Sequence, residues 1–132
     1  MRRYYIYIIG VMLLMAGCDT EISDNGHLDG FWVMQERQGI TWSFQGDILE
    51  LRDTKGEAQD IVMSFRHAGD LLTVSEPYFV ERDSGDIRIE TTAPLVPYGI
   101  TGLEEQLKVI KLTGDRMTLE GENNSRLNFR KY

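Results

Sequence analysis

Apolar and polar residues alternate along most of the chain after residue 28, in short segments separated by turns that contain glycine. In the segment ITWSF, for example, Ile40, Trp42 and Phe44 lie on one face of an extended strand, and the segments IVMSFRH and IRIE repeat this pattern. A period of two is that of a β-strand with one buried face. Turn residues recur about every ten residues between these segments, a spacing that predicts an antiparallel sandwich or barrel.

One stretch interrupts the alternation. Residues 91–103 contain Pro94 and Pro97, which cannot donate hydrogen bonds within a central sheet. We expect an edge strand here, or a long connection across one end of the sheet. The remaining segments predict an all-β domain of about eight strands, which fits a small antiparallel up-and-down barrel because closure leaves no exposed strand edges.

The first residues have a different character. Arg2 and Arg3 precede an apolar run that ends at Ala16-Gly17, and this order is typical of a secretory signal peptide. The run is shorter than the roughly 20 apolar residues that span a bilayer. The segment Leu-Met-Ala-Gly-Cys, which ends at Cys18, resembles a bacterial lipobox. The alternative is an ordinary signal peptide with a cysteine nearby by coincidence.

The lipobox resemblance implies that residues 1–17 are removed and that Cys18, bearing diacylglycerol and palmitate-like chains, becomes the first residue of the mature protein. Cys18 is the only cysteine in the sequence. An unpaired thiol would be reactive in an oxidising compartment, and acylation removes it. We therefore expect a membrane anchor at Cys18 and no disulfide.

Residues 18–27 are polar and acidic, and they predict a flexible tether between the anchor and a domain that covers residues 28–132. In lipoproteins of the Bacteroidetes, an acidic run after the cysteine resembles a signal for export to the cell surface. In enterobacteria, an aspartate at the position of Asp19 resembles an inner-membrane retention signal. We expect a lipid-anchored protein of the cell envelope, at the outer membrane rather than the inner one.

The net charge of the chain is −7, and removal of the signal would take away two arginines and leave all 21 acidic residues. This balance argues against binding to nucleic acid or to anionic lipid headgroups through a basic patch.

The sequence Gly30-Phe31-Trp32 opens the first expected strand with the motif Gly-x-Trp. This motif resembles the start of the lipocalins, in which the tryptophan closes one end of the barrel and an arginine of the last strand packs over it. In this chain the resemblance implies a structural plug of Gly30, Trp32 and either Arg126 or Arg130, and we favour Arg130. An arginine over an indole face is physically favourable.

The lipobox, the segments GDLLTV and YGITGLEEQLKVIKLTGDRMTLEG and the final LNFRKY together resemble the small lipocalin-like lipoproteins of unknown function from Bacteroides and related Bacteroidetes. The resemblance covers nearly all of residues 28–132 and implies a fold and a compartment, but no reaction. The chain is shorter than true lipocalins, lacks their other motifs and has no clear C-terminal helix.

Catalytic chemistry has little support in the sequence. The two histidines are His27, in the expected tether, and His67, beside a glycine turn, where a solvated side chain is expected. A structural zinc site uses four nitrogen or sulfur ligands, and no calcium or phosphate loop has the required spacing. We therefore expect no catalytic residues, no metal and no cofactor.

Five aromatic residues are candidates for a ligand or partner surface: Trp42, Phe44, Tyr78, Phe79 and Tyr98. A barrel of eight strands is either just filled by its own side chains or holds one small ligand. The first hypothesis is non-catalytic binding of a small apolar or amphipathic ligand in a cavity framed by these residues. The alternative is a filled barrel that acts as an accessory module, docking to another envelope protein through residues 77–80 and 94–100.

Overall fold

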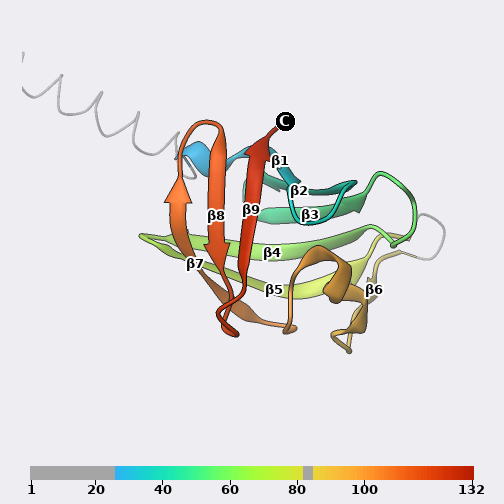
Figure 1. The fold of residues 1–132 in the computed structure, drawn as a ribbon. Helices are drawn as coiled ribbons and strands as arrows, with labels where there is room; N and C mark the ends of the chain where they lie inside the picture. Colours follow the sequence, from blue (N-terminus) through green and yellow to red (C-terminus); the bar gives the residue numbers. More distant parts are fainter. Residues whose placement is uncertain (1–25, 82–84) are drawn as a thin grey trace, which may run out of the picture.

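A computed structural model describes residues 26–81 and 85–132, which form one antiparallel sheet and two short 3₁₀ helices (Figure 1). The predicted signal peptide, Cys18 and most of the predicted tether lie outside these residues. The helices are η1 (Gly26–Leu28) and η2 (Ala93–Tyr98). The strands are β1 (Gly30–Met34), β2 (Ile40–Gln45), β3 (Ile48–Asp53), β4 (Ile61–Ala68), β5 (Leu71–Phe79), β6 (Ile87–Arg88), β7 (Glu105–Leu112), β8 (Arg116–Glu120) and β9 (Arg126–Lys131).

Eight of the strands close into a barrel. The sheet order is β4-β3-β2-β1-β9-β8-β7-β5-β6, and an additional pairing of β4 with β5 closes the ring. Each strand of the ring pairs antiparallel with the strand before it and the strand after it, and β1 pairs with β9. The predicted up-and-down barrel of about eight strands is confirmed.

Strand β6 lies outside this ring. One edge of β5 pairs with β7 over residues 71–74 and then with β6 over residues 78–79. Between the two pairings, Glu76 has a left-handed backbone conformation with φ of 53°. This irregularity lets one strand serve two neighbours on the same edge.

The barrel has two ends, which we name after the 3₁₀ helix at each. The η1 end contains η1, the β2–β3, β4–β5 and β7–β8 turns and the last residue, Tyr132. The η2 end contains η2 and the β1–β2, β3–β4 and β8–β9 connections. In Figure 1 the η1 end lies at the upper left and the η2 end at the lower right.

Side chains alternate between a buried and a more exposed position along the strands, as the sequence predicted. In β2, Ile40, Trp42 and Phe44 are buried, and the residues between them are partly exposed. Tight turns connect such strands, and Gly46 and Gly69 have φ values of 64° and 62°, in the left-handed region that glycine adopts without strain. The apolar faces of all eight barrel strands therefore meet in one core.

The proline-rich stretch forms a connection over the η2 end, one of the two arrangements expected for it. Two residues of η2, Leu95 and Tyr98, are fully buried, as is Ile100 just beyond it. The helix ends at Gly99, where φ is 83° and a Cβ atom would lie 2.8 Å from Leu127 Cδ2. Glycine is therefore required there for both conformation and space. No helix in residues 26–81 or 85–132 is long and apolar enough to cross a bilayer.

Candidate functional site

The interior of the barrel is packed with aromatic rings. The Trp42 ring centroid lies 4.9 Å from that of Phe129 and 6.2 Å from that of Phe44, and Phe44 meets Phe65 edge-on at 5.0 Å. All four side chains are at least 97% buried. Such ring pairs add to the stability that apolar burial provides. Trp42 and Phe44, which the sequence offered as ligand-contacting residues, are therefore core residues.

Tyr98 closes the η2 end. Its hydroxyl donates a hydrogen bond to the carbonyl oxygen of Gln59 at 2.8 Å, and its own carbonyl oxygen accepts one from Trp42 Nε1 at 3.1 Å. Burial, and secondarily the negative charges of Asp60 and Asp53, raise the pKa of the Tyr98 phenol well above its usual value of 10.0. Tyr98 is thus a neutral, hydrogen-bonded part of a lid over the barrel.

Tyr78 and Phe79 are neighbours on β5 and point to opposite sides of the sheet. Phe79 packs against the core, whereas Tyr78 lines a shallow outer hollow of about 190 Å³ with Ile48 and Val62. The five aromatic residues proposed from the sequence are therefore divided among the core, the η2 lid and the outer surface. The structure does not bring them together around one cavity.

At the η1 end, Trp32 forms the plug that the Gly-x-Trp resemblance implied. Its side chain is fully buried, and Nε1 donates a hydrogen bond to the carbonyl oxygen of Leu28 at 2.8 Å. Gly30 has φ of 121°, and a Cβ atom there would lie 2.8 Å from Lys131 Cε. Glycine at this position leaves room for the lysine that covers the plug.

The cation over Trp32 is Lys131, so the prediction of Arg130 is wrong. Lys131 Nζ lies 4.6 Å from the indole centroid and donates hydrogen bonds to the carbonyl oxygens of His27 and Asp29. Arg130 is exposed and faces outward, opposite Val33 of β1. The alternation along β9 could have identified Lys131 as the inward cation. Lys131 shares the inward side of the strand with Leu127 and Phe129, whereas Arg130 and Arg126 share the outer side.

Comparison with known proteins agrees with this architecture. Residues 12–132 match the family model described as a lipocalin-like domain. The chain belongs to this lipocalin-like domain family. No curated protein matches the sequence.

Two solved structures resemble the lipocalin-like domain in fold. A lipocalin-like protein from Bacteroides uniformis has a TM-score of 0.60 and 15% identity, over 81% of this chain and 100% of that one. An uncharacterised protein from Bacteroides eggerthii has a TM-score of 0.56 and 17% identity, over 80% of this chain and 99% of that one. The predicted resemblance to lipocalin-like proteins of Bacteroides is confirmed.

Two hollows in the described part of the lipocalin-like domain lie on the outside of its sheet. One of about 230 Å³ runs along the outer face of β1–β3 and is lined by Phe31, Tyr132 and polar residues such as Thr41. A more polar hollow of about 590 Å³ lies where β5 changes neighbours, between Glu76, Arg88 and Glu104. These positions favour contacts with molecules that approach the outer surface.

His67 Nε2 is buried at the η1 end without a hydrogen-bond partner there, and no carboxylate within residues 26–81 or 85–132 forms an ion pair with it. The same residues contain no group of three histidine, cysteine, aspartate or glutamate side chains placed to hold a metal ion.

Glu105 is the buried charged residue of the described core, and its role is structural. Oε1 accepts hydrogen bonds from the backbone N–H and the hydroxyl of Thr101, at 2.7 and 3.0 Å, and Oε2 accepts one from the N–H of Glu122 at 3.3 Å. The carboxylate therefore joins the connection after η2 to the β8–β9 turn. The alternation along β7 could have indicated its burial, because Glu105 occupies an inward position two residues before Leu107.

Proposed function

We propose that this protein is a lipid-anchored, non-catalytic accessory module of the cell envelope, which binds another envelope protein through the outside of a filled barrel. The observation that carries the proposal is the aromatic packing around Trp42, which occupies the space that a ligand in the interior would need. Of the two hypotheses that the sequence left open, this packing favours the accessory module over binding of a small apolar ligand.

The partner surface that we propose is the η2 end. Three apolar side chains are exposed there, Val80, Ile87 and Val96, with exposed fractions of 39%, 49% and 59%. They lie among connections rich in acidic residues, such as Glu81 and Glu90. A partner with basic groups around an apolar contact would complement this surface.

The proposed anchor is Cys18, acylated after removal of residues 1–17, and the proposed location is the outer membrane. The lipobox-like segment and the acidic residues after it support both points. Cys18→Ala should release the protein from the membrane fraction, or leave it there with its signal peptide uncleaved. A wild-type protein with a free thiol at Cys18 would rule out the anchor.

Native mass spectrometry tests the filled interior. The chain from residue 18 onward with Cys18→Ser, purified gently from a bacterial host, should show its own mass alone, before and after incubation with envelope lipid extract. A reproducible additional mass that disappears on denaturation would show a ligand inside the barrel and contradict the proposal.

Variants of the exposed apolar residues test the partner surface. Val96→Lys should abolish chemical cross-linking to an envelope partner because it places a charge in the apolar contact. Ile110→Lys is the matched control, since Ile110 is 39% exposed on β7, close to the β7–β8 turn at the η1 end. Equal cross-linking by the two variants would exclude the η2 end as the partner surface.

A further inference from the structure

Charge is unevenly divided between the two ends of the barrel. The connections of the η2 end are strongly acidic, whereas at the η1 end basic and acidic residues are nearly balanced. Counted over the described connections and the two strand residues on each side of them, the acidic residues of the η2 end are Glu36, Asp53, Glu57, Asp60, Glu81, Asp86, Glu90, Glu104, Glu105, Glu120 and Glu122, against Arg37, Arg52, Lys55, Arg88 and Arg126. Counted in the same way, the η1 end has Lys111, Arg116, Arg130 and Lys131 against Asp29, Asp47, Asp70 and Asp115.

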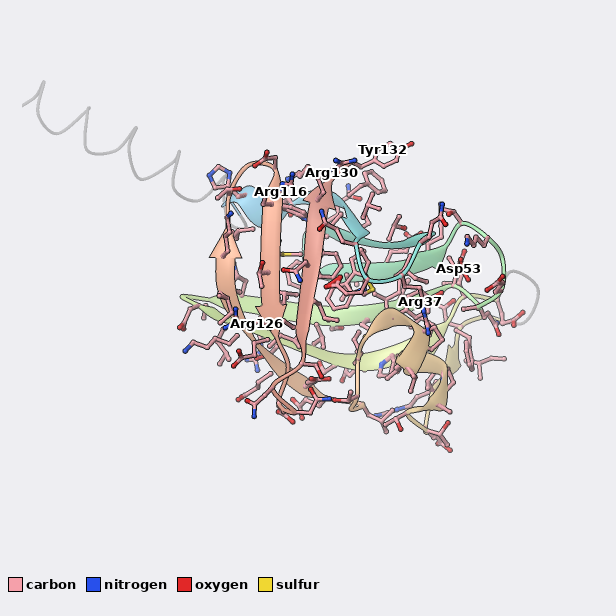
Figure 2. The ribbon with its side chains drawn as sticks, in the orientation of Figure 1. Arg37, Asp53, Arg116, Arg126, Arg130 and Tyr132 are labelled. Carbon is pink, nitrogen blue, oxygen red and sulfur yellow. The ribbon has the colours of Figure 1, made fainter. Side chains whose placement is uncertain are left out.

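The basic residues of the η1 end gather on the outer face of β7–β9. Arg116 and Arg130 are directly opposite each other on neighbouring strands, and Lys111 lines the same outer hollow as Arg116. Figure 2 shows Arg116 and Arg130 together along the top of the barrel, away from Arg37 and Arg126. Neither Arg116 nor Arg130 forms an ion pair with any described residue.

Two exposed aromatic side chains continue this basic surface. Phe31 is 59% exposed on the outer face of β1, and Tyr132 is 91% exposed at the end of β9. The two residues are adjacent, because the Tyr132 N–H donates a hydrogen bond to the Phe31 carbonyl oxygen at 2.9 Å. We refer to these residues together as the Arg116–Tyr132 surface, comprising Phe31, Lys111, Arg116, Arg130 and Tyr132.

The chain enters the barrel at the same end. The described part begins at Gly26 in η1, and only the eight residues from Cys18 to Asn25 separate it from the proposed acylated cysteine. Eight fully extended residues reach at most about 29 Å. A lipid at Cys18 would therefore hold the η1 end close to the membrane, with the Arg116–Tyr132 surface beside the point of attachment.

We infer that the Arg116–Tyr132 surface docks onto the anionic lipid headgroups of the membrane that holds the anchor, an inference that rests on the proposed lipid attachment. Arginine recognises phosphate oxygens with paired N–H donors, and aromatic rings are favourable at the boundary between headgroups and acyl chains. The acidic η2 end is repelled by the same lipids. Docking thus points the proposed partner surface away from the membrane.

This local attraction differs from the expectation drawn from net charge. The whole chain is acidic, and its composition argued against anionic lipid. Attraction to a charged surface falls off within a Debye length of about 10 Å at moderate salt, so the residues nearest the membrane decide its sign. The tether holds the η1 end nearest to the lipid, and at this end acidic residues do not outnumber basic ones.

The test uses tethered protein, so that its outcome is independent of acylation in the cell. The core residues all lie between Leu28 and Phe129, so the chain from residue 18 onward contains the entire barrel. This chain, with Cys18→Ser and an N-terminal hexahistidine tag, is held on nickel-chelating vesicles of phosphatidylcholine, with or without phosphatidylglycerol. A polarity-sensitive dye on Tyr132→Cys reports docking, and the same dye on Glu57→Cys reports the η2 end.

The dye at residue 132 should move to a less polar environment when phosphatidylglycerol is present, and return when salt is raised. The dye at residue 57 should not respond. Arg116→Gln and Arg130→Gln should each lower the ratio of docked to free protein about fivefold. One basic residue near an anionic surface strengthens binding to it by about that factor. The charge-matched control is the pair Arg37→Gln and Arg126→Gln, which should change it little.

Three results would overturn the inference. The first is a dye at residue 132 that reports the same environment with and without phosphatidylglycerol. The second is an equal loss of docking in the control pair, which would indicate an effect of net charge alone. The third is docking that appears only after the acidic residues Asp19, Glu21 and Asp24 are neutralised, which would show that the tether itself covers this surface. Failure of Cys18 acylation in cells would instead refute the proposed anchor.

Discussion

The two ends of the barrel are both closed, but by different means. At the η1 end, residues near the two termini of the described chain meet, and Trp32 is held between the Leu28 carbonyl and the ammonium of Lys131. At the η2 end, a connection from the middle of the chain folds over the opening and is held by Tyr98 and Glu105. At each end the buried indole or phenol donates a hydrogen bond to a backbone carbonyl oxygen, so closure is part of the folded core at both ends.

Among substitutions that test how the two ends are closed, loss of Trp32 should have the largest effect on stability. Trp32→Ala removes a fully buried indole from the η1 end and should lower the free energy of unfolding by about 3–5 kcal/mol. Urea denaturation followed by circular dichroism measures the change. Phe31→Ala, next to it but exposed, should change stability by less than about 1 kcal/mol. Comparable losses in the two variants would contradict the assignment of Trp32 as the plug.

Glu105 tests the η2 end in the same way. Glu105→Gln keeps one acceptor oxygen but loses the charge and part of the hydrogen bonding to Thr101 and Glu122, and should cost about 1.5–3 kcal/mol. The neighbouring Glu104 is exposed, so Glu104→Gln is a matched control with little expected effect. Hydrogen exchange should show faster opening of residues 99–105 in the first variant alone. Unchanged exchange there would remove Glu105 from the closure of this end.

Substitution of Lys131 should cause a smaller loss of stability, and substitution of Arg130 should cause almost none. Lys131→Met should cost about 1–2 kcal/mol, because it removes a cation from the Trp32 face and two hydrogen bonds to backbone carbonyls at a partly exposed site. Arg130→Met should leave the denaturation midpoint nearly unchanged. The reverse order would restore arginine as the residue that completes the plug.

The smallest effect at neutral pH is expected for Tyr98→Phe, at about 1 kcal/mol for one hydrogen bond to Gln59. The pKa of Tyr98 is raised on folding, so its contribution is fully present below pH 10, the usual tyrosine value, and is lost as the pH rises above it. Wild-type stability should therefore fall more steeply above pH 10 than that of Tyr98→Phe. Parallel pH profiles would show that Tyr98 ionises as easily in the folded protein as in the unfolded one.

Alternation along the strands was sufficient to predict the barrel and its inward faces, because a closed sheet with one filled side imposes a period of two on every strand. The same rule, applied to the last strand, distinguishes Lys131 from Arg130. The resemblance to lipocalins instead implied an arginine at this place. Tyr78 and Phe79 illustrate a related point, since neighbouring residues on a strand cannot line the same cavity.

Other features lay beyond the reach of the local pattern. The burial of Tyr98 depends on where a proline-rich connection folds, and the contact of Trp42 with Phe129 depends on the pairing of the first strand with the last, which places β2 and β9 on either side of β1. The charge division between the ends likewise requires the topology, because the residues that form each end come from separate turns along the chain. The composition gives the net charge of these residues but not where they lie.

The pairing of β1 with β9 has a consequence for the order of folding. The hydrogen bond from Lys131 to His27 joins residues 104 positions apart, so the plug cannot form until nearly the entire chain is available. Contacts of such long range form slowly, because the intervening chain must be ordered before they add stability. During synthesis, the segment that emerges first must therefore wait for the one that emerges last, and a protein truncated before β9 would remain an open sheet with two unpaired edges.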